Sequence, residues 1–369
     1  MSLLSVFRNP GSPVSQRQKT GWIGIDIGTR AIKLAQLERA GGRLHINRNL
    51  VIRADDNPFD LQSFSSGRVG ETIRKALQVH GGFRGRETAC VVSMNHCQLR
   101  TLVSAKGTDD EQRELISLEM ENDHHVSKVP QEFEFWDASN GEHHEQRGMT
   151  QLHVLSIPRT LADAVANNLL HAKLQCHVLD AVPFATVRAS EMATGFSTAA
   201  IAGPSYTVLD WGYSVATLTV VHLGQPFITR TLKHCGMQRI MQGVSQQLKL
   251  SATEAEAILT NYGVSATLHG AGKQSELQSL ITNLSTSATS DLIEEIRETV
   301  SFMKMQFPDQ MPAHLCVMGG GAAIRNMDLL LQQQLRLPVH NWNLRGSPSE
   351  SVSPIFATAA ALSALAWEL

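Results

Sequence analysis

The chain has 369 residues, of which 42% are hydrophobic, and its formal net charge at pH 7 is -2. Such a chain can bury a large core and is long enough for about two or three domains. The balanced charge argues against nucleic-acid binding, because clustered Lys and Arg normally neutralise the phosphates. The 5 cysteines are widely spaced and include no C-x-x-C pair, so neither a zinc site nor a disulfide framework is predicted.

The two ends of the chain predict no membrane span. Residues 1–20 carry scattered prolines and no sustained periodicity, which favours a flexible tail over a short amphipathic membrane contact. No secretory leader is recognisable, so we expect a cytoplasmic protein with reduced thiols. The Ala-rich segment 355–367 is shorter than the roughly 20 residues that a membrane span needs, and it predicts a packed helix.

The segment 23–29 predicts an apolar strand that ends in a tight turn. Asp26 lies near the strand end, Gly28 can adopt a positive φ cheaply, and Thr29 adds a hydroxyl, so backbone N–H groups can converge on phosphate. The Asp26 carboxylate would repel phosphate but can hold water-coordinated Mg²⁺. Lys33 alternates with apolar residues in the next strand and is interpreted as solvent-facing. A helix is then expected to end at Gly81.

Short strands at 89–93 and 98–103 precede a helix with a capping box at its start, residues 108–111. The extended segment that follows is aromatic, and alternating aromatic residues are typical of a core-facing strand. Another strand is expected at 152–157. The histidine pairs at 124–125 and 143–144 lack the i, i+4 spacing of a helical metal site, so solvated side chains are favoured over zinc.

A degenerate copy of the first hairpin occurs at 209–214, where Asp210, Gly212 and Ser214 take the places of the earlier Asp, Gly and Thr. Two copies of one hairpin predict two related half-molecules that together grip one metal-bound polyphosphate. The residues from 237 to 300 predict helices, with a Ser/Thr/Gly-rich excursion at 264–290. A third element, the glycine triplet after the strand 315–318, allows a flat ring to approach the backbone.

With these motifs the chain resembles the actin-like ATPase superfamily, and within it the PilM-type pilus assembly proteins, which are related to the cell-division protein FtsA. The hairpins resemble the two phosphate motifs, and the glycine triplet resembles the adenosine motif. The resemblance implies an α/β duplicated actin-like (RNase H-like) fold, with two lobes around a nucleotide cleft and a small inserted α+β subdomain. It continues through segments 179–185, 227–236, 255–257, 338–339 and 353–354.

The resemblance also implies domain limits. We expect a flexible tail at 1–20, a first actin-like subdomain at 21–86 plus 150–195, an inserted partner-binding subdomain at 87–149, a second actin-like subdomain at 196–236 plus 301–369, and a helical nucleotide-side subdomain at 237–300.

ATP and Mg²⁺ are the ligands that the resemblance implies. The two hairpin turns would cradle the phosphates, the glycine triplet would cover adenine or ribose, and the two aspartates would hold the metal. These residues are Gly28, Thr29, Gly212, Ser214, Gly319, Gly320, Gly321, Asp26 and Asp210. Asp180, which opens the connecting helix, is the candidate for orienting the attacking water, with helix-start capping as its structural alternative.

Several residues depart from the family pattern, among them Ile240, which replaces a usual Thr. Trp211 and Tyr213 are bulky and would crowd the γ-phosphate, Met237 follows a turn that lacks its second glycine, and Leu259 stands where the family has a nucleotide-facing Lys. A good contact to a charged group contributes roughly 1.5 to 3 kcal/mol, so losing one weakens nucleotide binding. We therefore expect ATP binding with at most slow hydrolysis.

By the same resemblance, the groove between the inserted and first subdomains binds the N-terminal cytoplasmic tail of a PilN-like inner-membrane protein. Candidates for its lining are Glu119, Glu121, Phe133, Phe135 and Trp136. The chain would then be a cytoplasmic ATP-binding scaffold for a type IV pilus or a related secretion platform, held at the inner membrane through its partner. Whether it forms a homo-oligomer stays open.

Two other functions remain. A small-molecule kinase, acting on a sugar or carboxylate, shares the duplicated hairpin but needs a carboxylate base beside an acceptor hydroxyl. A nucleotide-free pseudo-ATPase scaffold is the second, because of Met237 and Leu259. A P-loop NTPase is excluded, because Gly272-Lys273 is followed by Gln274 and the first glycine of the motif is missing.

Overall fold

The computed structural model describes residues 19–54, 58–122, 129–137, 148–193, 205–265, 276–345 and 352–368. Within them it has three sheets, with strand orders β3-β2-β1-β4-β8, β11-β10-β9-β12-β13 and β5-β7-β6. The expected tail and both histidine pairs lie outside these residues, except for residues 19 and 20.

The two five-stranded sheets repeat one topology. In each, a three-stranded antiparallel meander is continued by two strands that pair in parallel, β4 and β8 in the first sheet and β12 and β13 in the second. The first sheet contains β1 (Ile23–Ile27), β2 (Ala31–Ala40), β3 (Arg43–Arg53), β4 (Glu87–Val92) and β8 (Gln175–Leu179). The second contains β9 (Ser205–Trp211), β10 (Ala216–His222), β11 (Gln225–Leu232), β12 (Leu315–Met318) and β13 (Val339–Asn341). This repeat confirms the duplicated α/β fold.

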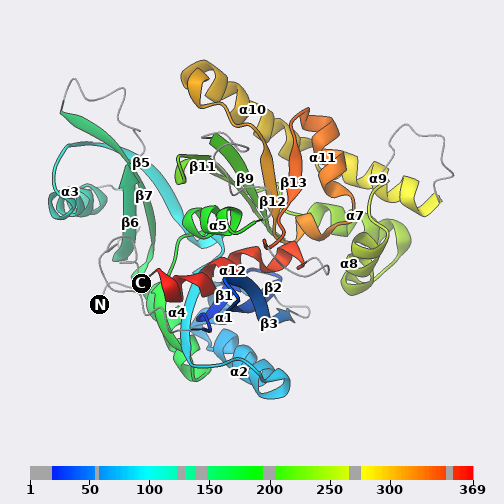
Figure 1. The fold of residues 1–369 in the computed structure, drawn as a ribbon, viewed down its shortest axis with the longest axis horizontal. Coiled ribbons are helices and arrows are strands. Elements are labelled where there is room, and N and C mark those ends of the chain that lie inside the picture. Colours follow the sequence, from blue (N-terminus) through cyan, green and yellow to red (C-terminus); the bar gives the residue numbers. More distant parts are fainter. Residues whose placement is uncertain are drawn as a thin grey trace.

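We call the part built on the first sheet the first lobe and the part built on the second sheet the second lobe. Two helices, α5 (Val182–Glu191) and α12 (Ala357–Ala364), lie between the sheets in Figure 1. A Cβ on Gly24 of β1 would come within 1.9 Å of the Ala359 carbonyl oxygen, so only glycine lets α12 approach this closely. The C-terminal segment therefore packs as a buried helix, as expected.

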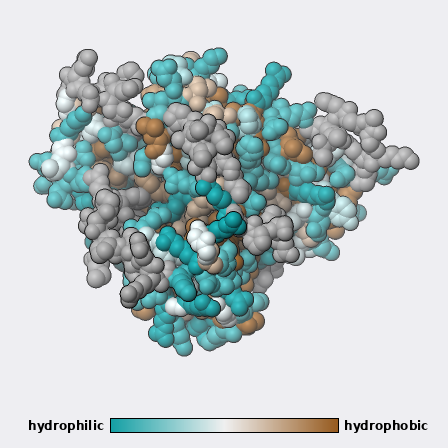
Figure 2. All heavy atoms as spheres, viewed as in Figure 1, coloured by the Kyte–Doolittle hydropathy of each residue, from teal (hydrophilic) through white to brown (hydrophobic). Residues whose placement is uncertain are grey.

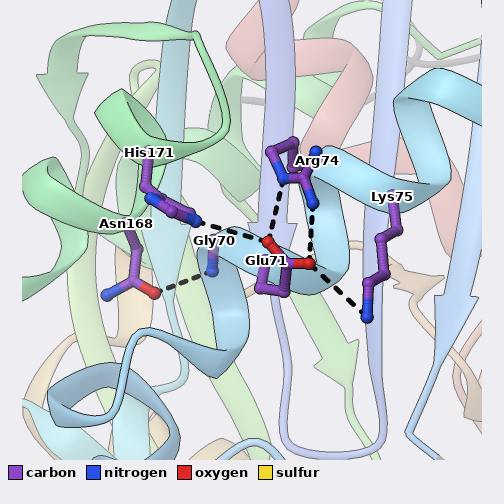
Figure 3. A network of polar contacts seen from close by, with 6 residues as sticks. All are labelled: Gly70, Glu71, Arg74, Lys75, Asn168 and His171. Atoms are coloured by element: carbon purple, nitrogen blue, oxygen red, sulfur yellow. Dashed lines mark hydrogen bonds and ion pairs between the residues drawn. The ribbon is translucent and has the colours of Figure 1, made fainter.

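The outer face of the first sheet is covered by α1 (Leu61–Ser65), α2 (Arg68–His80) and α4 (Arg159–His171). At Gly70 a Cβ would meet the Asn168 carbonyl oxygen at 2.3 Å, and the Gly70 N–H donates to the Asn168 side chain at 2.7 Å. A surface network with Glu71 at its centre, drawn in Figure 3, continues the same α2–α4 contact. Its other members are Arg74, Lys75 and His171. The α2 helix ends at Gly81 with a φ of 50°, as predicted.

The third sheet belongs to the inserted subdomain and consists of β5 (Gln98–Ala105), β6 (Gln131–Asp137) and β7 (Met149–Pro158). It is packed against α3 (Asp109–Asn122), which begins with the predicted capping box. The expected limits of this subdomain, residues 87 and 149, differ from the observed ones at both ends. The strand β4 pairs within the first sheet, and β7 is the central strand of the third, because it pairs with β5 on one side and β6 on the other.

The second lobe carries a helical layer. Its helices are α7 (Gln238–Leu248), α8 (Ala252–Asn261), α9 (Glu276–Ala288), α10 (Ser290–Gln306) and α11 (Met327–Leu335). The polar segment 264–290, expected to be an irregular excursion, contributes α9, whose Ile281 is buried against this layer; residues 266–275 lie outside the described part. No helix among the described residues is long and apolar enough to cross a membrane. In Figure 2 the visible face is mostly hydrophilic, with scattered hydrophobic residues.

Candidate functional site

The turns of the two hairpins meet between the lobes. Thr29 Oγ1 and Ser214 Oγ are 2.9 Å apart, although they are 185 positions apart in the chain. The first turn is closed by the Gly28 N–H, which donates to the Ala31 carbonyl at 3.1 Å. Asn95 donates from Nδ2 to Ser214 Oγ at 3.0 Å. The two turns that the sequence predicted as phosphate-binding thus lie side by side.

A cleft opens at these turns, and its lining comes from both lobes. Its empty space is about 1020 Å³ with the open mouth included. The two hairpins supply the Thr29 and Ser214 hydroxyls at one end. Neither Gly28 nor Gly212 has the positive φ that we expected from the sequence, and the Gly28 N–H already bonds within its own turn. The apolar wall contains Val182, Met237, Met241, Leu259, Ile324 and Ile355. Polar turns at one end and an apolar wall suit a ligand with a charged tail and a flat apolar ring.

Two carboxylates and one ammonium group lie at the polar end. Lys33 Nζ is 2.8 Å from Asp26 Oδ2, and both side chains are largely buried. Burial lowers the pKa of Lys33, but Asp26 and Asp210 outweigh that effect, so the pKa lies above its usual value. Burial, followed by repulsion from Asp26, raises the pKa of Asp210 to about 7, against the opposing influence of Lys33. The end of the cleft therefore holds one firm ion pair and one carboxyl that titrates near neutrality.

The donor set at this end fits Mg²⁺ bound together with a polyphosphate. No group of three or more His, Cys, Asp or Glu side chains among the described residues could hold a metal alone. Mg²⁺ does not need such a group of three side chains, because it usually keeps several waters and binds through one or two carboxylates plus phosphate oxygens. Asp26 and Asp210 are the carboxylates that would hold it, and the metal would neutralise charge on the phosphates. Because Lys33 already pairs with Asp26, a metal would have to compete with this ammonium group.

The three glycines of the triplet have three different surroundings. Gly320 lines the cleft. Gly319 has a φ of +84°, and a Cβ there would meet Asp210 Oδ1 at 2.7 Å. A Cβ on Gly321 would meet the Trp211 ring at 2.1 Å. Only Gly320 is therefore placed to cover a base or ribose in this conformation, whereas its neighbours make room for Asp210 and Trp211.

Trp211 does not crowd the phosphate end, contrary to our expectation. Its side chain is buried in the second-lobe core, and its Nε1–H donates to the Cys235 carbonyl at 2.8 Å. The alternation of a strand explains this, because Asp210 and Trp211 point to opposite faces of β9. Tyr213 does line the cleft, as do Met237 and Leu259.

Asp180 lies outside the cleft lining. Its carboxylate accepts from the Ala181 N–H at 2.8 Å and pairs with Arg188 at 2.9 Å, and its side chain is fully buried. The residue that α5 presents to the cleft is Val182, which has no polar group. Asp180 therefore serves as a buried ion-pair partner and does not cap α5, whose N-cap is Ala181 and has no side-chain cap bond. A role in orienting water stays a prediction.

The candidate partner residues divide between two faces of the inserted subdomain. Phe133 and Phe135 pack beneath α3, with the Arg113 guanidinium over both rings at 5.4 and 5.2 Å. Glu119 and Glu121 are exposed on α3. Trp136 points to the opposite face of the sheet, where its Nε1–H donates to the Pro226 carbonyl of the second lobe at 2.9 Å. The four residues near α3 stay candidates for one surface, and Trp136 does not share it.

Sequence reasoning missed four charged residues of the cleft lining, Arg30, Lys33, Arg53 and Glu256. Lys33 was interpreted as solvent-facing, yet a hairpin that turns at Gly28 places it opposite Asp26 in the register. Arg53 on β3 and Glu256 on α8 form a bidentate ion pair at the cleft, with Nη2 and Oε1 2.5 Å apart. Their separation of 203 positions left no local signal.

A family model described as "Type IV pilus assembly protein PilM" matches residues 24–346. Among solved structures, a PilM-PilN type IV pilus biogenesis complex covers 95% of this chain and 100% of its own, with a TM-score of 0.72 and 19% identity. The ethanolamine utilization protein EutJ from Carboxydothermus hydrogenoformans covers 95% and 91%, with a TM-score of 0.51 and 12% identity. MreB 5 of Spiroplasma citri, bound to AMPPNP, covers 93% and 95%, with a TM-score of 0.50 and 11% identity.

A search of curated proteins finds no match to the sequence. At the identities found, the solved structures show the fold alone, and their shared architecture confirms the actin-like fold of this chain.

Proposed function

The chain belongs to the family of PilM type IV pilus assembly proteins, and we propose that it is an ATP-binding scaffold that docks the cytoplasmic tail of a PilN-like inner-membrane partner. It would act on the cytoplasmic side of the membrane, held there by that partner. The family and the similarity to a PilM-PilN complex support the assembly role. ATP, Mg²⁺ and the tail itself are our proposals.

One observation carries the nucleotide half of the proposal. The two hairpins, far apart in the chain, bring Thr29 and Ser214 within 2.9 Å of each other at the polar end of a cleft. Their hydroxyls can donate hydrogen bonds to phosphate oxygens, and Asp26 and Asp210 line the same cleft. The similarity to an MreB structure bound to AMPPNP supports a nucleotide as the anion.

Hydrolysis would be slow. The connecting helix α5 presents Val182 to the cleft, and an aliphatic side chain cannot orient an attacking water. The scaffold would then respond to the presence of nucleotide more than to its turnover. Bound ATP would shift the angle between the lobes and so change the partner surface, which requires different affinities for two states.

A nucleotide-free scaffold is the second candidate. The Lys33 ammonium already neutralises Asp26, and Leu259 places an apolar side chain in the cleft lining. Both features weaken the case for a metal-bound nucleotide. The same binding experiment separates the two candidates.

The test is a titration of the full chain with labelled ATP in the presence of Mg²⁺. We expect wild type to bind and Asp26→Ala to bind roughly tenfold or more weakly, because a contact to a charged group is lost. Asp163→Ala, a change at an exposed position on α4, is the control and should bind like wild type. No binding by wild type, or equal binding by wild type and Asp26→Ala, would contradict the proposal.

A further inference from the structure

A row of three side chains crosses one face of the inserted sheet. Thr101 on β5, His153 on β7 and Trp136 on β6 are direct neighbours in the strand register. The face is opposite to the one that packs against α3, because Phe135 and Val154, which pack there, are the adjacent residues. The row therefore points away from the candidate partner surface.

This row contacts the edge of the second sheet. Trp136 Nε1–H donates to the Pro226 carbonyl at 2.9 Å, and His153 Nε2 is 2.9 Å from the Phe227 carbonyl oxygen. The strand β11, which carries both carbonyls, is the outermost strand of that sheet. An edge strand has backbone groups without a strand partner, and here side chains from the inserted sheet satisfy two of them.

The hydrogen bonds fix the state of His153. A carbonyl oxygen only accepts, so Nε2 must carry the proton, and Nδ1 then accepts from the Thr101 hydroxyl at 3.0 Å. Burial lowers the pKa of His153, which keeps the ring in the neutral form that this pattern needs. Thr101 thereby orients the imidazole toward the second lobe.

The contact continues into the core on both sides. Trp136 meets the ring of Phe184 on α5 edge-on at 4.9 Å, and α5 lies between the two five-stranded sheets. Phe227 is buried and meets Phe307 edge-on at 4.8 Å, at the end of α10. Edge-to-face aromatic pairs are favourable beyond their burial. The row is therefore held between the connecting helix and the core of the second lobe.

We infer that Trp136 and His153 form a joint that ties the inserted subdomain to the second lobe and conveys movement of that lobe to the partner surface. This inference rests on the proposed function. The inserted sheet is continuous in the chain with the first lobe, and Leu155 on this face packs in one core cluster with Ala89 and Val91 of β4. The same face nevertheless bonds to the second lobe through Trp136 and His153. When the lobes rotate about α5, either the joint breaks or the inserted sheet follows β11, and the surface near α3 then moves relative to the first lobe.

The test compares wild type with Trp136→Phe, which keeps an aromatic ring against Phe184 and removes the N–H donor together with the five-membered ring of the indole. Backbone hydrogen exchange is measured in the full chain, with and without Mg²⁺ and AMPPNP. Without nucleotide, β6 and residues 227–232 of β11 should exchange roughly threefold to tenfold faster in the variant, as the loss of one hydrogen bond predicts. With nucleotide, wild type should change exchange in β5, β6 and β7, and the variant should lose that response while its affinity for AMPPNP is retained.

The matched control is Trp22→Phe, the same chemical change at a ring that stacks on His177 in the first lobe, 5.1 Å away. It should keep the nucleotide response. If Trp136→Phe kept the nucleotide-induced change in hydrogen exchange of β5, β6 and β7, the inference of a joint would be contradicted. Unchanged exchange in β11 of the variant without nucleotide would contradict it as well. Neither result would affect the proposal of nucleotide binding. Wild type that binds no AMPPNP would overturn the proposed function and, with it, the conveying role.

Discussion

Asp210 lines the cleft, and the pKa of its side chain is raised far above its usual value. Its carboxyl is partly buried beside Asp26, and its pKa rises from 3.8 to about 7. Between these values the folded protein holds a proton that the unfolded chain has lost, so the free energy of unfolding falls as pH rises through this window. A metal ion bound to both carboxylates would also relieve the repulsion between Asp26 and Asp210. The metal ion and the proton would therefore compete for Asp210.

We therefore expect Mg²⁺-dependent nucleotide affinity to rise by roughly tenfold between pH 6 and pH 8, as a single competing proton requires. Asp210→Asn should bind more weakly and show a flat pH profile, whereas Asp163→Asn on the surface should keep the wild-type slope. Titrations with labelled ATP across this pH range measure both. An equally steep profile in Asp210→Asn would assign the titration to another group.

Asp180 offers a second test at this scale. Its ion pair with Arg188 is buried on both sides, with side-chain exposures of 0% and 12%. Arg188 keeps a second partner, Glu368, at 2.8 Å, so removing Asp180 leaves its charge partly paired. Asp180→Ala should therefore lower the free energy of unfolding by about 1–3 kcal/mol and leave ATP affinity unchanged, as measured by urea denaturation and ATP titration. Normal stability combined with loss of slow ATP turnover would instead support the water-orienting role.

Among the elements, β3 and α8 lie at the cleft and are joined by the Arg53–Glu256 ion pair. The geometry is bidentate, but Arg53 is 46% exposed, which limits its contribution. Breaking it should speed nucleotide release by roughly twofold to fivefold, the range expected of an exposed pair. Stopped-flow release from Arg53→Glu, Glu256→Arg and the double swap tests this. The swap should restore the wild-type rate, and failure to restore it would remove the pair from the release step.

Elements with a local signal were predicted well, and contacts between distant elements were not. The hairpin at Gly28, the capping box before α3 and the end of α2 follow from turn and cap chemistry within a few residues. Lys33 was misplaced because it was considered alone, although the turn at Gly28 sets its register with Asp26. Trp136 was grouped with Phe133 although a strand sends them to opposite faces.

At the scale of the whole molecule, duplication is what the sequence predicted and the sheets confirm. The limits of the inserted subdomain were displaced, because strand pairing and not chain order decides which sheet a strand joins. The contacts between β6 and β11 and between β3 and α8 have no local signature in the sequence. These contacts link the cleft, the lobes and the inserted sheet.

The central claim is that the two hairpin turns close over one polyphosphate. A crystal structure of the full chain grown with Mg²⁺ and AMPPNP tests it most directly. We predict phosphate oxygens between the turns at Gly28–Thr29 and Gly212–Ser214, with the metal on the side of Asp26 and Asp210. Nucleotide bound elsewhere, or turns that separate and leave the phosphates uncontacted, would contradict it.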